Sequence, residues 1–556
     1  MLFLCQILFF GLLLLKQMAG YVIIHLKFIT FKEAKFMANI IPRPAKSKET
    51  DQKIWFSKKT VISGEFCEVA NLFEKLIPEA NEATENRLTF IVDTDIAEEG
   101  YKILYENGDI NIFCSARAGA LYGFMTIIQL AAGNDNFKSV LIEDAPKYNW
   151  RGFMLDCSRH FWSMDKLKQI LDYMASIKMN VFHWHLADDQ GWRIEIKKYP
   201  LLTEKGAIRK GTPYSVIHMR DKDSTYNVGE YGRGLFYTQE DAKEIVAYAA
   251  ERNIMVVPEI DVPGHSTAAI ACYPELSCTG EKIEVEPHFG IFKNNLCCAK
   301  PAVYEFVKTV IDELCEIFTA PYFHIGGDEV VSEPWDNCPD CQALMKKEGL
   351  ADHVALHGYF NNILVEHLKL RGKQTIGWNE IISDNIDKTA IPQVWTTRNT
   401  EKAVEWSETR GPVILTQYNY MYSDMAFALI PLSKTYNYSP YFEGFEDENI
   451  LGIEMPQWTE YIPNDKKFDF QTYVRLLAVS EVGWTDVRNK HYEDFETRVE
   501  TMRPYFKSIG INLAPKYIYC GNTIKGAENM TEAVRKDKGR FIWSRNPYFE
   551  LELMDY

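Results

Sequence analysis

The stretch RGFMLDCSRHFWSMDKLKQILDYMASIKMNVFHWHLADD, residues 151–189, contains the pattern that decides the fold. Its apolar runs at 151–155 and 180–186 have the length and composition of buried strands. Between these runs, apolar side chains recur at helical spacing from Lys166 to Lys178, and Ser163 suits a helix N-cap. A strand, a helix and a second strand in succession predict a βαβ unit with two parallel strands.

The same alternation continues toward the C-terminus. The further strands are expected at 254–260, 322–325, 375–378, 391–395, 413–416 and 451–455, and the helices at 242–251, 303–314 and 356–370. Eight strands that alternate with helices predict an α/β fold, a (β/α)8 TIM barrel with insertions, over residues 147–508.

A small α+β domain is expected before the barrel, at residues 37–146. Strand-like runs at 88–92 and 109–113 precede a helical pattern at 118–131. These elements are too few to extend the β/α alternation, so they predict a separate unit.

The two ends of the chain fit neither unit. Residues 2–15 are almost entirely apolar, but a membrane-spanning helix needs roughly 20 such residues, so 1–36 are expected to be a signal peptide or an N-terminal extension. A signal peptide would give a secreted or lysosome-like location, and an extension would leave the cytoplasm as the alternative. Asn437-Tyr-Ser and Asn529-Met-Thr fit the glycosylation pattern. Residues 509–556 are expected to form a short polar appendage.

Charge and motifs exclude several kinds of partner. The formal net charge is −16 at pH 7, which does not attract a polyphosphate backbone, so no nucleic acid partner is expected. The chain has no Walker loop and no GxGxxG motif at a strand–helix turn, so no nucleotide cofactor is expected either. No stable membrane span is predicted after residue 36, and the chain could form an oligomer.

The twelve cysteines are scattered along the chain and do not have the spacing of a small disulfide-rich domain. Cys338-x-x-Cys341 has no second CxxC partner, so a disulfide or free thiols are favoured over zinc. Cys278 could instead bridge its loop to Cys297 or Cys298. The sequence therefore predicts no metal ligands and no cofactor.

Polar and aromatic residues follow the expected barrel strands one after another, where a TIM barrel places its reactive groups. Any one of them could be a helix cap, an ion pair or a core aromatic, but their recurrence favours a shared site. The residues are Asp156, Arg159 and His160; His183, His185, Asp188 and Asp189; Glu259, Asp261 and His265; His324, Asp328 and Glu329; Trp378 and Glu380; Trp395; and Gln457, Trp458 and Glu460.

Asp328 and Glu329 are the candidate catalytic pair. Consecutive residues of a strand point to opposite faces, so both carboxylates reach one pocket only if the backbone turns, which Gly326-Gly327 permits. Two close carboxylates cannot both ionise freely, and a proton on one beside a charge on the other is what glycosidic cleavage needs. A site for a hard cation is the alternative, and the surrounding Trp and His residues disfavour it.

Four motifs resemble those of glycoside hydrolase family 20, the β-N-acetylhexosaminidases. They are RGFMLDCSRHF at 151–161, NVFHWHLADD at 180–189, PEIDVPGH at 258–265 and HIGGDE at 324–329. They occur in the family's order, and the resemblance covers about residues 40–508. The segments 99–102 and 118–130 also resemble the small α+β domain that precedes the barrel in this family.

The resemblance implies an exo-acting, retaining β-N-acetylhexosaminidase with a substrate-assisted mechanism, an exception to the usual two-carboxylate scheme. Glu329 would protonate the leaving oxygen and later deprotonate water. The 2-acetamido oxygen of the substrate would be the nucleophile and form an oxazolinium intermediate. Asp328 would hold the acetamido N–H and offset the developing positive charge. The expected partners are oligosaccharides or glycoconjugates that end in N-acetylhexosamine.

The remaining site residues are also carried over from the resemblance. Trp378, Trp395 and Trp458 would enclose the acetamido group and the sugar ring. Tyr422 would donate its hydroxyl to the acetamido oxygen, with Tyr420 as a competitor for that role. His265 would belong to the pocket, with His185 as a further candidate. The residues expected to bind sugar hydroxyls and to block extension of the chain are Arg159, Asp188, Asp424 and Glu460.

Two other functions share the same barrel. A carbohydrate-binding protein without turnover would usually have lost the acid, yet Asp328 and Glu329 are both present. A chitinase-like endo-enzyme or a disaccharide-releasing relative would differ in its product, which would be internal fragments or disaccharides instead of a monosaccharide from chain ends.

Overall fold

The computed structural model describes residues 39–80, 86–212, 230–427, 429–460, 462 and 464–519. The expected signal peptide or extension at 1–36, the Asn529 sequon and the appendage beyond Tyr519 lie outside these residues. Asn437 is described and its side chain is exposed. Across the described residues, helices of the length and apolarity that a lipid bilayer requires are absent.

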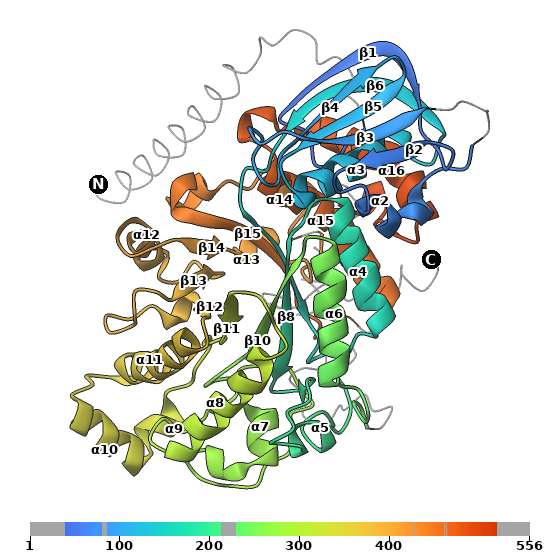
Figure 1. Cartoon of the computed structure of the whole chain (residues 1–556). Helices are drawn as coiled ribbons and strands as arrows, with labels where there is room; N and C mark the ends of the chain where they lie inside the picture. Colours follow the sequence, from blue (N-terminus) through green and yellow to red (C-terminus); the bar gives the residue numbers. More distant parts are fainter. Residues whose placement is uncertain are drawn as a thin grey trace, which may run out of the picture.

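The N-terminal domain is a six-stranded sheet with one long helix (Figure 1). The sheet order is β1-β6-β4-β5-β3-β2, in which β5–β3 and β3–β2 are parallel and the other pairs antiparallel. Its elements are β1 (Lys46–Trp55), β2 (Val61–Gly64), α2 (Val69–Leu72), η1 (Glu74–Leu76), β3 (Arg87–Val92), β4 (Tyr101–Glu106), β5 (Asp109–Cys114), α3 (Arg117–Ala131) and β6 (Asn136–Asp144).

Helix α3 lies between this sheet and the barrel, and this position explains its composition. Almost every side chain of α3 is buried because it packs on β4 and β5 on one side and on α4 on the other. A helix that is apolar all round is typical of such a two-sided environment.

The second domain is a closed barrel of eight parallel strands, as the β/α alternation predicts. β15 pairs with β7, which closes the sheet, and β10 pairs with β8. The barrel strands are β7 (Trp150–Asp156), β8 (Val181–Asp188), β10 (Met255–Ile260), β11 (Tyr322–His324), β12 (Gln374–Trp378), β13 (Ile391–Val394), β14 (Val413–Leu415) and β15 (Ile450–Gln457). A short strand β9 (Gly191–Trp192) folds back on β8.

Helices surround this barrel (Figure 1). The α-helices are α4 (Met164–Ser176), α5 (Leu201–Glu204), α6 (Gln239–Glu251), α7 (Thr267–Cys272), α8 (Pro301–Cys315), α9 (Glu333–Asp336), α10 (Pro339–Glu348), α11 (His353–Leu370), α12 (Thr400–Thr409), α13 (Tyr418–Met421), α14 (Leu432–Tyr436), α15 (Asp465–Trp484), α16 (Tyr492–Ser508) and α17 (Lys516–Tyr519). The short 3-10 helices are η3 (Pro274–Leu276), η4 (Asn379–Ile381), η5 (Pro440–Glu443), η6 (Asp447–Asn449) and η7 (Val487–Asn489).

Local sequence sets the start of these helices. Ser163 caps α4 by accepting a hydrogen bond from the backbone N–H of Lys166, as predicted. Thr238 and Asp241 form a capping box at the start of α6. Such caps satisfy backbone donors that have no partner within the helix.

Buried ion pairs join the two domains. Arg151 on β7 donates to Glu99 at 2.8 Å, and Lys178 after α4 lies 3.0 Å from Asp144 at the end of β6. Trp484 of α15 also donates its indole N–H to Asp144, at 2.9 Å. The small domain is therefore fixed on the side of the barrel formed by β7, α4 and α15.

The disulfide that Cys278 could have formed with Cys297 or Cys298 is absent from the structure, and the alternative of free thiols holds for these residues. Every cysteine that the structure describes is free. The sulfur of Cys278 lies 3.9 Å from that of Cys341, and the sulfur of Cys297 lies 3.6 Å from the same atom. The sulfurs of these distant segments meet as a group and do not pair.

Candidate active site

A pocket of about 610 Å³ opens at the carboxyl ends of the barrel strands. This volume is within the usual range for small-molecule sites, about 300–1,000 Å³. The predicted site residues that line it are Arg159, Asp188, His265, Asp328, Glu329, Trp395, Tyr422, Trp458 and Glu460.

The turn after β11 brings two consecutive carboxylates to this pocket. Gly326 and Gly327 have φ of +68° and +91°, and Glu329 itself has φ of +50°. A Cβ on Gly326 would lie 1.9 Å from Oδ1 of Asp261, so only glycine fits there. The backbone N–H of Gly327 donates to the same oxygen at 3.0 Å. The turn is thus fixed by Asp261, and Asp328 and Glu329 both face the pocket.

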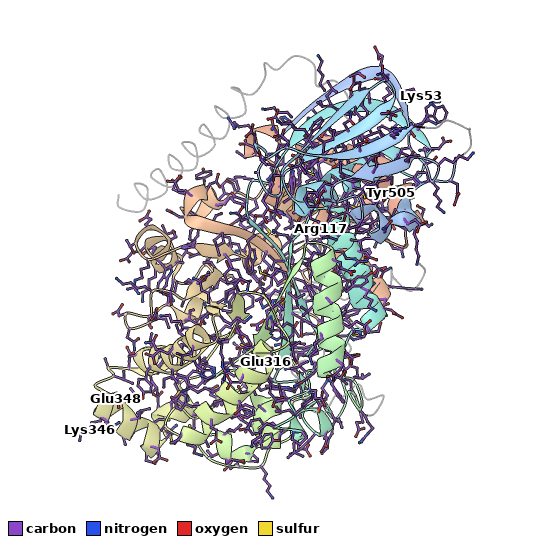
Figure 2. The ribbon with its side chains drawn as sticks, in the orientation of Figure 1. Lys53, Arg117, Glu316, Lys346, Glu348 and Tyr505 are labelled. Atoms are coloured by element: carbon purple, nitrogen blue, oxygen red, sulfur yellow. The ribbon has the colours of Figure 1, made fainter. Side chains whose placement is uncertain are left out.

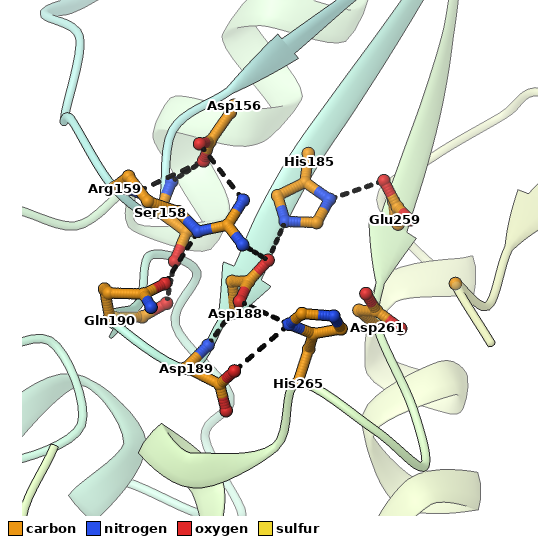
Figure 3. Close-up of polar contacts among 12 residues, drawn as sticks. Asp156, Ser158, Arg159, His185, Asp188, Asp189, Gln190, Glu259, Asp261 and His265 are labelled. Carbon is orange, nitrogen blue, oxygen red and sulfur yellow. Dashed lines mark hydrogen bonds and ion pairs between the residues drawn. The ribbon is translucent and has the colours of Figure 1, made fainter. Parts of the chain in front are cut away.

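His265 connects this pair to the far wall. Its Nε2 lies 3.6 Å from Oε2 of Glu329 and 4.0 Å from Oδ2 of Asp328. Its Nδ1 lies 3.1 Å from both Asp188 and Asp189 (Figure 3). Burial lowers the pKa of His265, but the surrounding carboxylates outweigh burial and hold it well above its usual range. His265 is therefore a cation, and it neutralises the acidic groups around it.

The carboxyl group of Asp328 has a raised pKa. Burial raises its pKa to about 6, the charge of Glu329 adds to the rise, and His265 opposes it. Burial and the charge of Asp328 also raise the pKa of the neighbouring Asp261 well above its usual range. Asp261 thus keeps its proton near neutral pH and can donate a hydrogen bond to Asp328, which then bears the charge of the pair. Sequence reasoning placed Asp261 at a strand end without giving it a role.

Arg159 is held rigidly at one end of the pocket. Its guanidinium lies 2.6 Å from Asp188 and 3.3 Å from Asp156, and its Nε donates to Gln190 at 2.6 Å (Figure 3). It also lies over the ring of Trp458, 5.1 Å from the centroid. A guanidinium with its geometry fixed in advance loses little entropy when it binds a hydroxyl.

Behind Asp188 lies a buried polar layer in the barrel interior. His185 is fully buried and bridges Asp188 at 3.0 Å and Glu259 at 2.5 Å, so it supports the pocket wall without lining it. Glu259 also lies 3.0 Å from His183 and 3.1 Å from His324. This layer holds Asp188 and, through it, Arg159 in place.

The aromatic side chains form one cluster against the pocket. Trp395 and Tyr422 stack with centroids 6.1 Å apart, and Tyr422 lies 6.5 Å from Trp458. Trp378 is almost completely buried behind Trp458, with centroids 5.9 Å apart, and donates its N–H to Glu259. The predicted tryptophans are thus brought together, with Trp378 as the inner layer.

Of the two tyrosines considered for the hydrogen bond to the acetamido oxygen, only Tyr422 lines the pocket. The ring of Tyr420 packs against Tyr438 at 5.0 Å and lies under the Lys434 ammonium. Asp424 is buried and is not among the pocket-lining residues.

Sequence reasoning placed Glu380 at a strand end without giving it a role, and it missed several residues that line the pocket. Glu380 accepts a hydrogen bond from Trp395 at 2.9 Å, and burial and the charge of Asp328 raise its pKa to about 8. The missed residues lie on loops or in the short helix α13, where no hydrophobic period marks them: Phe289, Gly290, Ile291, Thr396, Thr397, Arg398, Tyr418, Asn419 and Met425.

The pocket acids do not form an obvious cation site. Asp261, His265 and Asp328 lie close enough to share an ion, as do Asp188, Asp189 and His265. In both groups the His265 imidazolium already supplies the positive charge. The arrangement instead offers a paired acid and carboxylate beside apolar rings, which suits a sugar.

Residues 148–487 match the catalytic domain of glycosyl hydrolase family 20, and residues 37–145 match domain 2 of the same family. The chain belongs to glycosyl hydrolase family 20. The resemblance found in the sequence is therefore confirmed, as is the barrel that follows a small N-terminal domain.

Individual members of glycosyl hydrolase family 20 show the extent of the likeness. A β-hexosaminidase of Porphyromonas gingivalis is 34% identical in an alignment of 514 positions that covers 85% of this chain and 64% of that protein. A β-hexosaminidase of Vibrio furnissii is 35% identical and covers 69% of this chain and 65% of that protein. The chain thus spans slightly less than two thirds of the length of these relatives.

A solved family 20 structure has the same fold. The exo β-N-acetylglucosaminidase of Vibrio harveyi, in complex with N-acetylglucosamine, matches with a TM-score of 0.75 and 30% sequence identity. The match covers 87% of this chain and 80% of that one.

Proposed function

We propose that the protein is an exo-acting, retaining β-N-acetylhexosaminidase that removes terminal, non-reducing N-acetylhexosamine from glycans by substrate assistance. The observation that carries the proposal is that consecutive carboxylates, Asp328 and Glu329, face one pocket walled by Trp395, Tyr422 and Trp458. The β-hexosaminidase names of the relatives and the N-acetylglucosamine bound in the Vibrio harveyi enzyme support the same substrate class.

In this proposal, Glu329 is the general acid and base. Its side chain is 30% exposed, the more open of the two carboxylates, so it can reach the glycosidic oxygen and later a water molecule. It gives its proton to the leaving oxygen in the first step and takes a proton from water in the second. The His265 cation, 3.6 Å away, stabilises Glu329 whenever it is ionised.

Asp328 prepares the nucleophile. As a carboxylate it accepts a hydrogen bond from the acetamido N–H, which orients the acetamido oxygen toward the anomeric carbon and offsets the positive charge that develops on the ring. In this proposal the hydroxyl of Tyr422, which lines the same pocket, donates a hydrogen bond to that oxygen. The oxazolinium intermediate then forms without a bond to the protein.

Arg159, Asp188 and Glu460 make the enzyme exo-acting. Arg159 and Asp188 are buried and held by hydrogen bonds, so they cannot move aside for a longer chain. Charged groups of fixed position bind the hydroxyls of a terminal sugar and exclude a further sugar beyond it.

The test is product analysis on chitooligosaccharides, with a chromogenic N-acetyl-β-glucosaminide and the matching β-glucoside as a pair. We expect release of the monosaccharide from chain ends and no cleavage of the glucoside, which lacks the acetamido nucleophile. Internal fragments would support an endo-enzyme, and binding without release at any pH would support a carbohydrate-binding protein.

The Glu329→Gln variant tests the assigned acid. We expect kcat/KM to fall about 100- to 10,000-fold while N-acetylglucosamine still binds, because only proton transfer is lost. Calorimetric titration with the sugar measures binding, and the chromogenic substrate measures turnover. Wild-type turnover in this variant would remove Glu329 from its role.

A further inference from the structure

Four cysteine side chains from two separate loops meet beside the pocket. Cys278 follows η3 and Cys297 closes the same loop, which comes after β10; Cys338 and Cys341 come from the start of α10, after β11. The four sulfurs all lie within 4.8 Å of one another. Three of these thiols are buried, and Cys278 is partly buried.

The distances between the sulfurs fit a tetrahedron. The sulfurs of Cys297 and Cys341 are 3.6 Å apart, those of Cys278 and Cys341 3.9 Å, and those of Cys297 and Cys338 4.0 Å. Four thiolates bound to one Zn²⁺ at about 2.3 Å are about 3.8 Å from each other. Disulfide sulfurs would be about 2.05 Å apart.

We propose that Cys278, Cys297, Cys338 and Cys341 bind one structural Zn²⁺. A tetrahedral set of four cysteine sulfurs is one of the usual ligand sets of structural zinc. Four neutral thiols release four protons as they bind the ion, which gives a Zn(S-Cys)4 unit with a charge of two minus. Because all four positions are taken by protein ligands, the metal stabilises the fold and takes no part in glycoside cleavage.

The packing of α10 supports this assignment. Cys341 is its only buried residue, while Lys346 and Glu348 project into solvent at the edge of the molecule (Figure 2). A helix with so small a buried face gains little from packing. Zinc bound at the first turn of α10 would attach this helix to the loop that carries Cys278 and Cys297. The backbone N–H of Ala299 also donates to the sulfur of Cys297.

The site would hold two active-site loops together. The loop closed by Cys278 and Cys297 contains Phe289 and Ile291, which line the pocket. Next to the cysteines, the backbone N–H of Leu296 donates to Pro263 and the indole of Trp335 donates to the Leu296 carbonyl, both at 2.9 Å. Zinc therefore links the pocket rim to the segment that follows Asp328 and Glu329.

Metal analysis of the full chain, purified without a polyhistidine tag, tests the proposal. We expect one zinc per chain by mass spectrometry, and its release when a mercurial reagent titrates the thiols. Cys297→Ala should lose the metal and lower the unfolding temperature. The matched control is Cys298→Ala, because Cys298 is the adjacent buried thiol outside the cluster, and this variant should retain one zinc.

The wild-type measurement also decides the matter if Cys297→Ala fails to fold. Tetrahedral thiolate coordination should give the intense visible absorption of Co²⁺ when cobalt replaces zinc in the wild-type protein. A metal-free wild type with four reactive thiols would overturn the proposal. A mass lower by four hydrogens, which indicates two disulfides, would also overturn it, as would bound iron in place of zinc.

Discussion

The raised pKa of Asp328 gives the proposed reaction a pH dependence. Burial and the charge of Glu329 raise this pKa to about 6, and the proposed mechanism needs Asp328 as a carboxylate. As the pH falls through about 6, Asp328 takes up a proton and loses the charge that holds the acetamido group. We therefore expect kcat/KM to decrease on the acidic side with a midpoint near pH 6, measured in the free-enzyme profile.

The control is Asp328→Asn, which cannot ionise. We expect its kcat/KM to be about 100- to 1,000-fold lower, the usual cost of removing one group that stabilises developing charge. Its residual activity should lack the acidic limb near pH 6. An unchanged limb in this variant would assign the titration to another group.

Glu380 should make the protein less stable as the pH rises. Burial and the charge of Asp328 raise its pKa from 4.5 to about 8, so the folded state keeps a proton that the unfolded state releases. Between these values the unfolded state binds fewer protons, and the free energy of unfolding decreases with pH. Glu380→Gln keeps an acceptor for Trp395 but cannot ionise, so its unfolding temperature should decrease less between pH 5 and pH 8.

An exposed glutamate provides the comparison for Glu380. Glu366 lies on the outer face of α11, and Glu366→Gln removes one charge without affecting the pocket. Its unfolding temperature should follow the wild-type pH curve. If the Glu380→Gln curve ran parallel to that of the wild type as well, the proton would not be held at Glu380.

At the scale of an element, the turn after β11 decides whether both carboxylates reach the pocket. Gly326→Ala would strain a backbone with φ of +68° and press a Cβ against Asp261 at 1.9 Å. Left-handed backbone costs a non-glycine residue about 1–2 kcal/mol, and the contact adds to that cost. A displaced turn should also lower kcat/KM by about 100-fold, because a shift of about 1 Å disrupts alignment.

Gly372→Ala is the control that separates the cost of left-handed backbone from the cost of a steric clash with the new Cβ. Gly372 has φ of +70°, but a Cβ there would meet no atom within 4 Å. This variant should lose about 1–2 kcal/mol of unfolding free energy and keep its kcat/KM. Equal effects of both alanines on activity would show that contact with Asp261 does not position the pair.

Most barrel elements could be predicted because they are buried on both faces. The run at 151–155 became β7 (Trp150–Asp156), and 451–455 became β15 (Ile450–Gln457), each within two residues. Strand β1 was missed because its sequence, KSKETDQKIW, is polar, and pairing with β6 at the sheet edge creates the strand. Sequence pattern thus locates elements that bury apolar faces, whereas edge strands depend on their neighbours.

The residues of the candidate active site divide in the same way, into those that sequence pattern could locate and those that it could not. Arg159, Asp188, Asp328 and Trp458 end buried strands or follow them directly, so the barrel rule found them. Phe289 lies on a loop and Tyr418 in the short helix α13, and only the folded chain defines the paths of these segments. The cysteine cluster could not be predicted because Cys278 and Cys297 are separated by a long loop, and only its closure brings them to Cys338 and Cys341.

At the scale of the whole molecule, the buried pair Lys178–Asp144 joins the small domain to the barrel. The two charged groups are 3.0 Å apart, and neither is exposed. Lys178→Met leaves the Asp144 carboxylate buried without its cation, which typically costs about 3–5 kcal/mol. We expect a large decrease in the unfolding midpoint by calorimetry and urea titration, with both domains affected.

The double variant Lys178→Met/Asp144→Asn distinguishes charge from packing. It removes both charges, while the asparagine oxygen can still accept from Ala45 and Trp484, as Asp144 does at 2.9 Å. We therefore expect the double variant to be more stable than Lys178→Met alone, because no uncompensated charge stays in the interface. Additive losses would mean that the pair contributes only through packing. A separate early transition of the small domain in the wild type would show that the interface does not couple the two domains.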